Sequence, residues 1–202
     1  MYIKESKCYW EVQEVPILGH IVGSGITRME PSKTKVIADW KPPTMKKEVQ
    51  KFIGFVNFYR CYIQGFLNIA HPITKLTGNI AFIWRQAEQQ AFEKLKSAIL
   101  SPNVISLPRK DGLFRLEVDA SGYAIGGMLS QLQDKKWKTI TFISRVMSSA
   151  EINYDIFDKE LLAVMYTLCE WHCYLLDVSE PFEIWTDHRN LTYFKKPQML
   201  NQ

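Results

Sequence analysis

Three acidic residues in the second half of the sequence have the types and settings of metal ligands. Asp119 and Asp187 each follow a short apolar run, and Glu160 lies within a long helical pattern. Carboxylates without an accompanying cysteine and histidine cluster favour Mg²⁺ or Mn²⁺ over Zn²⁺. Two such ions about 4 Å apart activate a water and stabilise the leaving oxygen of a phosphodiester. The pattern therefore indicates nuclease chemistry, although acids in such places also serve as surface residues or ion-pair partners.

The elements that must position these acids predict a mixed α/β domain. Alternation of apolar and polar residues from Phe114 to Asp119 is typical of a half-buried strand. If a helical connection makes the first and last strands parallel neighbours, Asp119 and Asp187 emerge at the same edge of the sheet. The expected elements are a strand over 114–119, a turn and strand within 120–131, a strand over 139–144, a longest helix from 150 to about 173, and a strand over 182–186.

The expected helix explains why Glu160 is notable. It shares a helix face with Ile156, Ala163 and Thr167. Further apolar residues around the helix predict that the helix is covered on more than one side. A carboxylate in such a place is costly unless it is paired or bound to a metal ion.

The first half of the sequence predicts a smaller unit of one hairpin and several helices. Residues from Val15 to Met29 form two β-rich arms around the turn Gly23-Ser24-Gly25. Pro31 suits the first turn of a helix, and Thr44 suits the N-cap of the next one. Gly65 is expected to end that second helix. Apolar positions singled out on the expected helices are Val36, Ile37, Trp40, Val49, Phe52, Ile53, Val56, Tyr59, Ile69, Ile73, Leu76, Ala91, Phe92, Leu95 and Ala98.

Composition indicates a folded, soluble protein of a reducing compartment. Hydrophobic residues make up 47% of the chain and charged residues 23%, which excludes a disordered or fibrous class. No apolar run approaches the roughly 20 residues that cross a bilayer, and no signal-peptide pattern follows Met1. Four cysteines lack the spacing of a disulfide framework. We expect an intracellular protein, cytoplasmic and/or nuclear, with no membrane partner and no small-molecule cofactor.

Charge is unevenly distributed along the chain. Residues 1–80 contain eleven Lys and Arg against six Asp and Glu, whereas residues 113–202 contain nine against twelve. A basic N-terminal part followed by an acidic C-terminal part is consistent with a nucleic-acid-binding region joined to a metal site. It is equally consistent with chance variation. Three lysines and one arginine lie off the apolar face of the helix after Thr44. They either contact phosphates or form a solvated face. These residues are Lys46, Lys47, Lys51 and Arg60.

A zinc site is the weaker alternative for the end of the long helix. Cys169 and Cys173 lie one turn apart beside Trp171 and His172. Zinc would need further ligands, and the remaining histidines (His20, His71 and His188) have no supporting motif. Core packing at the helix end accounts better for this cluster.

Longer motifs add a resemblance to a known family. VDASGYAIGGMLSQ around Asp119, NYDIFDKELLAVMYTL around Glu160 and IWTDHRNLTYF around Asp187 closely resemble the ribonuclease H domain of gypsy-like long-terminal-repeat retrotransposons. Further upstream, ILGHIVGSGI resembles the hairpin that holds the primer in reverse transcriptase. EPSKTKVIADWKPPTMKKEVQKFIGFVNFYRCYIQGF resembles the thumb and connecting segment, and HPITKLTGNIAFIWRQAEQQAFEKLKSAILSPNVISLP resembles the tether into ribonuclease H. The resemblance runs from about Lys7 to Tyr193.

This resemblance implies an α/β fold in three parts of a Pol polyprotein. Residues 1–80 would be the C-terminal part of reverse transcriptase with thumb-like helices, and residues 81–112 a helical tether. Residues 113–202 would be an incomplete ribonuclease H-like mixed sheet with a long helix. The chain ends about fifteen residues after Asp187, before the family's fourth acid, and we expect one sheet face to stay bare. The paired aspartates of the polymerase are expected upstream of the hairpin.

The implied activity is endonucleolytic hydrolysis of RNA in RNA–DNA hybrids, within a polyprotein that also performs RNA-directed DNA synthesis. Asp119 would bridge two Mg²⁺ or Mn²⁺ ions in a complete domain, and Glu160 and Asp187 would bind the ion on the leaving-group side. Implied partners are the hybrid and the template-primer duplex. Residues implied to bind nucleic acid are Leu18, Gly19, His20, Lys46, Lys47, Lys51 and Arg60. His188 matches a family position near the site and equally suits a polar loop residue. The alternative is an inactive or co-opted fragment that only binds nucleic acid.

Overall fold

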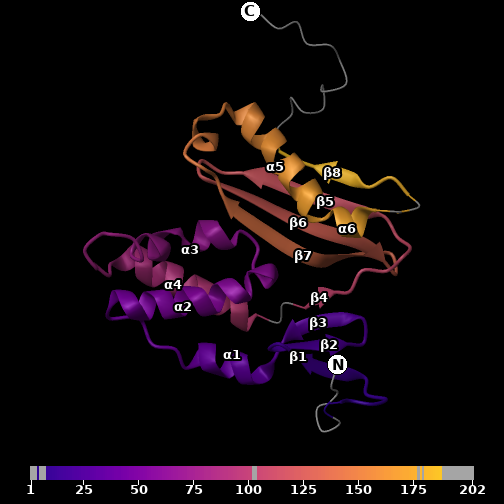
Figure 1. The fold of residues 1–202 in the computed structure, drawn as a ribbon, viewed down its shortest axis with the longest axis horizontal. Helices are drawn as coiled ribbons and strands as arrows, with labels where there is room; N and C mark the ends of the chain where they lie inside the picture. The colour runs from indigo at the N-terminus through magenta and orange to yellow at the C-terminus, as the bar shows by residue number, and fades with distance from the viewer. Residues whose placement is uncertain (1–3, 5–7, 102–103, 177, 179, 188–202) are drawn as a thin grey trace, which may run out of the picture.

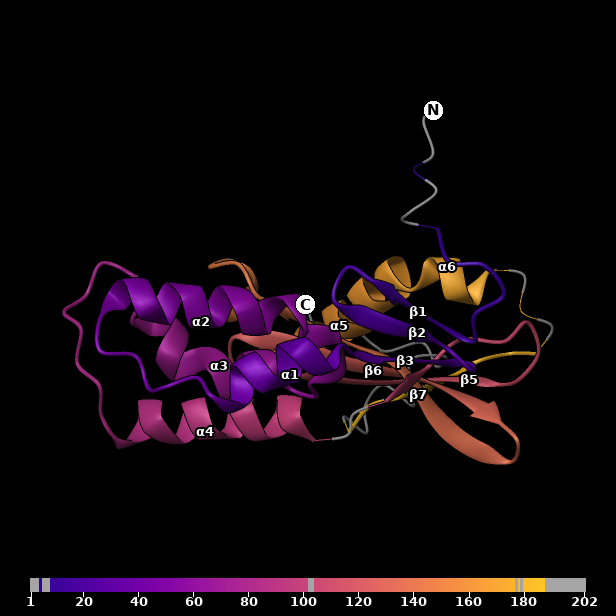
Figure 2. The same cartoon turned by 90° about the horizontal axis from the view of Figure 1, so that it is seen from below.

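The computed structural model describes residues 4, 8–101, 104–176, 178 and 180–187. Two units lie beside each other (Figure 1). One contains a small sheet and helices α1 to α4, and the other contains a larger sheet with helix α5 packed on one face (Figures 1 and 2). The predicted mixed α/β class is confirmed. No helix among the described residues has the length and apolar character needed to cross a membrane.

The small sheet corrects the expectation of a single hairpin. Strands β1 (Glu14–Ile17), β2 (His20–Gly23) and β3 (Ile26–Met29) form an antiparallel meander, and β4 (Ile105–Ser106) pairs with β3. The expected turn at Ser24-Gly25 is present. A second two-residue turn at Leu18-Gly19 divides the first arm, and both of its residues have positive φ (49° and 84°). That backbone matches the strand twist, which is why such short turns close hairpins.

Four helices enclose the first core. They are α1 (Pro31–Ala38), α2 (Lys46–Phe58), α3 (Phe66–Lys75) and α4 (Gln86–Leu100), with a 3₁₀ turn η2 (Arg60–Tyr62) between α2 and α3. Gly65 does not end α2 as predicted, because α2 already ends at Phe58; it precedes α3 with a left-handed φ of 63°. Thr44 does not cap α2 as predicted, because the helix begins after Met45. The N–H and hydroxyl of Thr44 instead donate to Glu48 Oε2 at 2.7 and 3.0 Å. Fully buried side chains of this core include Ile37, Val49, Phe52, Val56, Ile73, Phe92 and Leu95.

The larger sheet has the strand order β7-β6-β5-β8. Strand β5 (Phe114–Ala120) is antiparallel to β6 (Ala124–Gln133), which is antiparallel to β7 (Lys136–Val146). Strand β8 (Glu183–Trp185) is parallel to β5, as the helical connection predicts. The strand predicted over 139–144 is longer than expected, because the turn between β6 and β7 has only two residues, Asp134 and Lys135, both with positive φ.

The helix predicted over 150–173 is not continuous. It divides into a 3₁₀ turn η3 (Glu151–Asn153), α5 (Ile156–Glu170) and α6 (His172–Leu175). Helix α5 has 15 residues, the same length as α4. Ala163 and Thr167 are buried towards the sheet with Glu160, as predicted, but Ile156 is 64% exposed. The expectation of a helix covered on more than one side is therefore wrong for the outer face of α5.

Candidate metal centre

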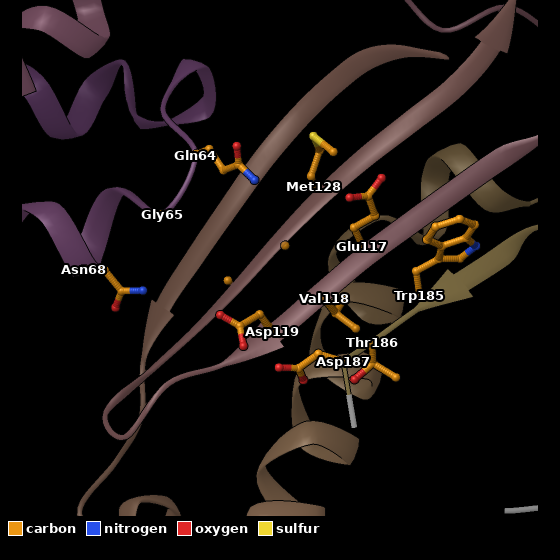
Figure 3. A pocket seen from close by; sticks show the side chains of 12 residues that line it. Gln64, Gly65, Asn68, Glu117, Val118, Asp119, Met128, Trp185, Thr186 and Asp187 are labelled. Carbon is orange, nitrogen blue, oxygen red and sulfur yellow. The ribbon is translucent and has the colours of Figure 1, made fainter. Parts of the chain in front are cut away.

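Topology brings the three predicted acids to one edge of the larger sheet. Asp119 is the penultimate residue of β5, and Asp187 follows the end of the parallel neighbour β8. Helix α5 carries Glu160 to the same place. One carboxylate oxygen from each of the three residues lies within 4.8 Å of the others. Figure 3 shows Asp119 and Asp187 side by side at the edge of a cleft. The predicted convergence of the three carboxylates is therefore present in the fold.

Glu160 is held from two sides. Its carboxylate accepts a hydrogen bond from the Ala120 N–H at 3.3 Å and another from the Thr186 hydroxyl at 3.1 Å. Ala120 ends β5 and Thr186 follows β8, so the carboxylate links the ends of the two parallel strands. This role of Thr186 was not predicted from the sequence, although the residue directly precedes Asp187.

Burial makes Glu160 electrostatically unusual. The residue is only 2% exposed, whereas Asp119 and Asp187 are exposed. Desolvation raises the pKa of Glu160, and the negative charges of Asp187 and Asp119 raise it further against the two hydrogen bonds that lower it. A bound cation would remove this repulsion. A buried carboxylate beneath two exposed ones fits a hard divalent ion that remains open to a substrate on one side.

Asp119 and Asp187 open into a cleft of about 490 Å³ between the two units. Glu117, Asp119 and Asp187 lie on the side formed by the sheet, and Gln64 and Asn68 lie on the side formed by the first unit (Figure 3). The amides of Gln64 and Asn68 were not singled out from the sequence. No motif or spacing links them to the acids, since the two sets of residues belong to different cores.

The residues implied to bind nucleic acid do not line this cleft. Leu18 is 83% exposed in the turn between β1 and β2. His20 is partly buried, its ring centroid lies 5.4 Å from that of Phe58, and its Nδ1 lies 2.7 Å from the Tyr62 hydroxyl. Desolvation lowers the pKa of His20. Lys47, Lys51 and Arg60 are exposed on α2 and η2, and Lys46 Nζ donates to the Gly78 carbonyl.

Core packing was predicted for the cluster of Cys169, Trp171, His172 and Cys173 at the end of the long helix. The prediction is correct for one of the four residues. Trp171 is 3% exposed, but Cys169, His172 and Cys173 are exposed. The two thiols are free. His188 lies outside the described residues.

Comparison with known proteins identifies the family. A family profile described as "RNase H-like domain found in reverse transcriptase" matches residues 84–184. The chain belongs to this family. It is also similar to the Transposon Tf2-3 and Tf2-4 polyproteins of Schizosaccharomyces pombe, with 36% identity over 194 residues to each. The match covers 95% of this chain and 14% of each polyprotein, so the chain spans about a seventh of the length of these relatives.

Solved structures with a similar fold come from foamy viral protease-reverse transcriptase. The complex with dsDNA described as dRH has a TM-score of 0.71 and 18% identity, covering 92% of this chain and 33% of that chain. The complex with RNA/DNA hybrid has a TM-score of 0.69 and 19% identity, covering 91% and 25%. At this identity the likeness concerns the fold. Together with the family match, it confirms the predicted relation to retrotransposon reverse transcriptase and ribonuclease H.

Proposed function

We propose that this member of the ribonuclease H-like family hydrolyses the RNA strand of RNA–DNA hybrids in a metal-dependent reaction. The supporting observation is the convergence of Asp119, Glu160 and Asp187, whose ligand oxygens lie within 4.8 Å of one another. The products would be a 3′-hydroxyl and a 5′-phosphate. RNA-directed DNA synthesis would belong to the longer polyprotein.

The three acids have distinct roles in this proposal. In a complete domain Asp119 would hold both ions, and Glu160 and Asp187 would hold the ion on the leaving-group side. Bound Mg²⁺ or Mn²⁺ would supply water activation and would neutralise the charge that develops on the leaving oxygen. Thr186 and the Ala120 N–H fix the Glu160 carboxylate, so one ligand is oriented before any cation binds.

The test is cleavage of a labelled RNA strand paired with DNA. We expect cleavage in Mg²⁺, none in EDTA, and none with Asp119→Asn in Mg²⁺. Double-stranded DNA of the same sequence should remain intact, because the nucleic acid is expected to be read by shape and sugar hydroxyls. Cleavage that persists in EDTA or with Asp119→Asn would contradict the proposal. Hybrid binding without cleavage would support the second candidate, a fragment that only binds nucleic acid.

We further propose that the basic side chains of the first unit bind the duplex, together with the hairpin residues Leu18, Gly19 and His20. Replacing Lys47 and Lys51 with glutamine should weaken hybrid binding and make it less dependent on salt. The slope of log K against log salt is negative, and each lost phosphate contact reduces its magnitude by roughly 0.9. Fluorescence anisotropy across a salt series measures both quantities.

Lys94 and Lys110 provide a matched control, because they are exposed lysines outside α2. Their double glutamine variant removes the same formal charge. If both double variants lower the salt slope equally, long-range attraction and not a specific α2 contact explains the effect.

We also propose that the chain divides into three parts at residues 80/81 and 112/113. The template-primer duplex would be a second partner, and the site of action would be cytoplasmic or nuclear.

A further inference from the structure

Two carboxamides face the acidic side of the cleft from the first unit. Gln64 lies between η2 and α3, and Asn68 lies in the first turn of α3. In Figure 3 both side chains extend from the α3 side towards the sheet, opposite Asp119 and Asp187. The two amides and the two aspartates therefore line one space of about 490 Å³, although 50 residues separate Asn68 from Asp119 in the sequence.

Neither amide contributes to the fold that surrounds it. Gln64 and Asn68 are exposed, and within the described part of the chain their side chains make no hydrogen bond. Two of their neighbours, Ile63 and Phe66, are buried in the first core at 2% exposure each. Packing of the local chain therefore fixes the backbone at this point, and the two amides remain available to a ligand.

A direct contact between the units fixes this side of the cleft relative to the acids. The Tyr123 hydroxyl donates to the Leu67 carbonyl at 3.0 Å, and the Tyr123 and His71 rings lie 4.2 Å apart. Tyr123 belongs to the turn between β5 and β6, four residues after Asp119. Leu67 and His71 lie on α3 beside Asn68. These contacts of Tyr123 with α3 therefore set the distance between the two sides of the cleft.

The chemistry of the two sides is complementary for a nucleic-acid backbone. A cation at the carboxylates neutralises the scissile phosphate, but the phosphates and sugars beside it need other partners. A carboxamide offers two N–H donors and one carbonyl acceptor, which suits phosphate oxygens and sugar hydroxyls. Contacts of this kind position the duplex without reading bases. Neutral amides also avoid ion pairing with the nearby carboxylates.

We propose that Gln64 and Asn68 bind the sugar–phosphate backbone beside the scissile phosphate and so position the hybrid over the carboxylates. This inference rests on the proposed function of the same site. Both residues act as positioning residues. Their loss should affect hybrid affinity and the place of cleavage more than the rate of the chemical step.

The experiment compares the wild-type chain with the double variant Gln64→Ala/Asn68→Ala. Binding of a labelled hybrid is measured in Ca²⁺ by anisotropy, and kcat, KM and cut positions are measured in Mg²⁺. Gln90→Ala is the control, because Gln90 is an exposed amide on α4 away from the cleft. We expect hybrid affinity to fall roughly tenfold, the scale of two hydrogen bonds, with KM raised more than kcat is lowered and cuts spread over neighbouring positions.

The outcomes separate this inference from the function on which it rests. If the wild type cleaves and the double variant matches Gln90→Ala in affinity, KM and cut positions, the inference is wrong and the proposed function stands. If the wild type does not cleave but the double variant still binds the hybrid more weakly than Gln90→Ala, the amides are contacts and the proposed nuclease activity fails.

Discussion

Glu160→Gln is expected to abolish metal-dependent cleavage while making the metal-free chain more stable. Glutamine keeps the size of the side chain and loses the charge that a divalent cation requires. Its carbonyl still accepts from the Ala120 N–H, and its amide N–H can donate to the Thr186 hydroxyl oxygen, so both contacts of the carboxylate are replaced. Cleavage should fall by at least about a hundredfold, the scale on which loss of one electrostatic contact to the reacting group acts.

The gain in stability follows from the raised pKa of Glu160. A carboxyl group whose pKa is higher in the folded state favours folding below its unfolded pKa and loses that contribution as pH rises through the folded value. Above the unfolded pKa of Glu160, which includes neutral pH, this raised pKa therefore opposes folding in EDTA. We expect Glu160→Gln to raise the free energy of unfolding there by on the order of 1 kcal/mol, or Tm by roughly 2–4 °C. The gain should shrink towards acidic pH.

In Mg²⁺ the wild type should become more stable than Glu160→Gln. Binding to the folded wild type stabilises it in proportion to the logarithm of metal concentration, and Glu160→Gln should lose most of this response. Thermal melts in EDTA and in increasing Mg²⁺ measure both effects. Asp158→Asn is the control, because Asp158 is an exposed carboxylate on the same helix and should leave the metal response intact. A Glu160→Gln variant less stable than wild type in EDTA would show that the carboxylate is satisfied without a cation.

The sequence predicted the larger sheet well, because its signals are local. Alternation from Phe114 to Asp119 gives a strand with Leu116 and Val118 buried, as the structure has it. The apolar run before Asp187 and the helical connection then make β8 a parallel neighbour of β5. The position of Asp119 at the sheet edge followed from its place at the end of this strand together with the parallel pairing that the helical connection predicts.

Features that depend on tertiary contacts could not be predicted in this way. Nothing in the local pattern indicates that Trp171 interrupts the helix or that Ile156 stays outside the core. The second turn at Leu18-Gly19 was missed because leucine at positive φ is uncommon. Gln64 and Asn68 gave no signal, since only the packing of two cores brings amides from one beside acids from the other.

Close approach of α5 to the sheet is a further tertiary feature, and it rests on Gly127. A Cβ atom at Gly127 would lie 2.9 Å from Thr167 Cγ2, 3.0 Å from Trp171 Cη2 and 3.2 Å from Ile143 Cγ2. Thr167 cannot easily yield, because its hydroxyl donates to the Ala163 and Val164 carbonyls at 2.9 Å each. Trp171 is 3% exposed and has little room to move. A side chain at this position therefore pushes α5 away from β6.

Gly127→Ala is expected to lower both the free energy of unfolding and the affinity for Mg²⁺. Overpacking of this kind costs about 1–3 kcal/mol, and a displaced α5 moves Glu160 away from Asp119. Gly126→Ala is the matched control, because the nearest atom to a Cβ there is the Asp119 carbonyl oxygen at 4.0 Å. Denaturant melts with and without Mg²⁺ compare the two variants. If Gly127→Ala loses stability but keeps the full response to Mg²⁺, the helix can move without displacing Glu160, and the carboxylate site does not depend on this contact.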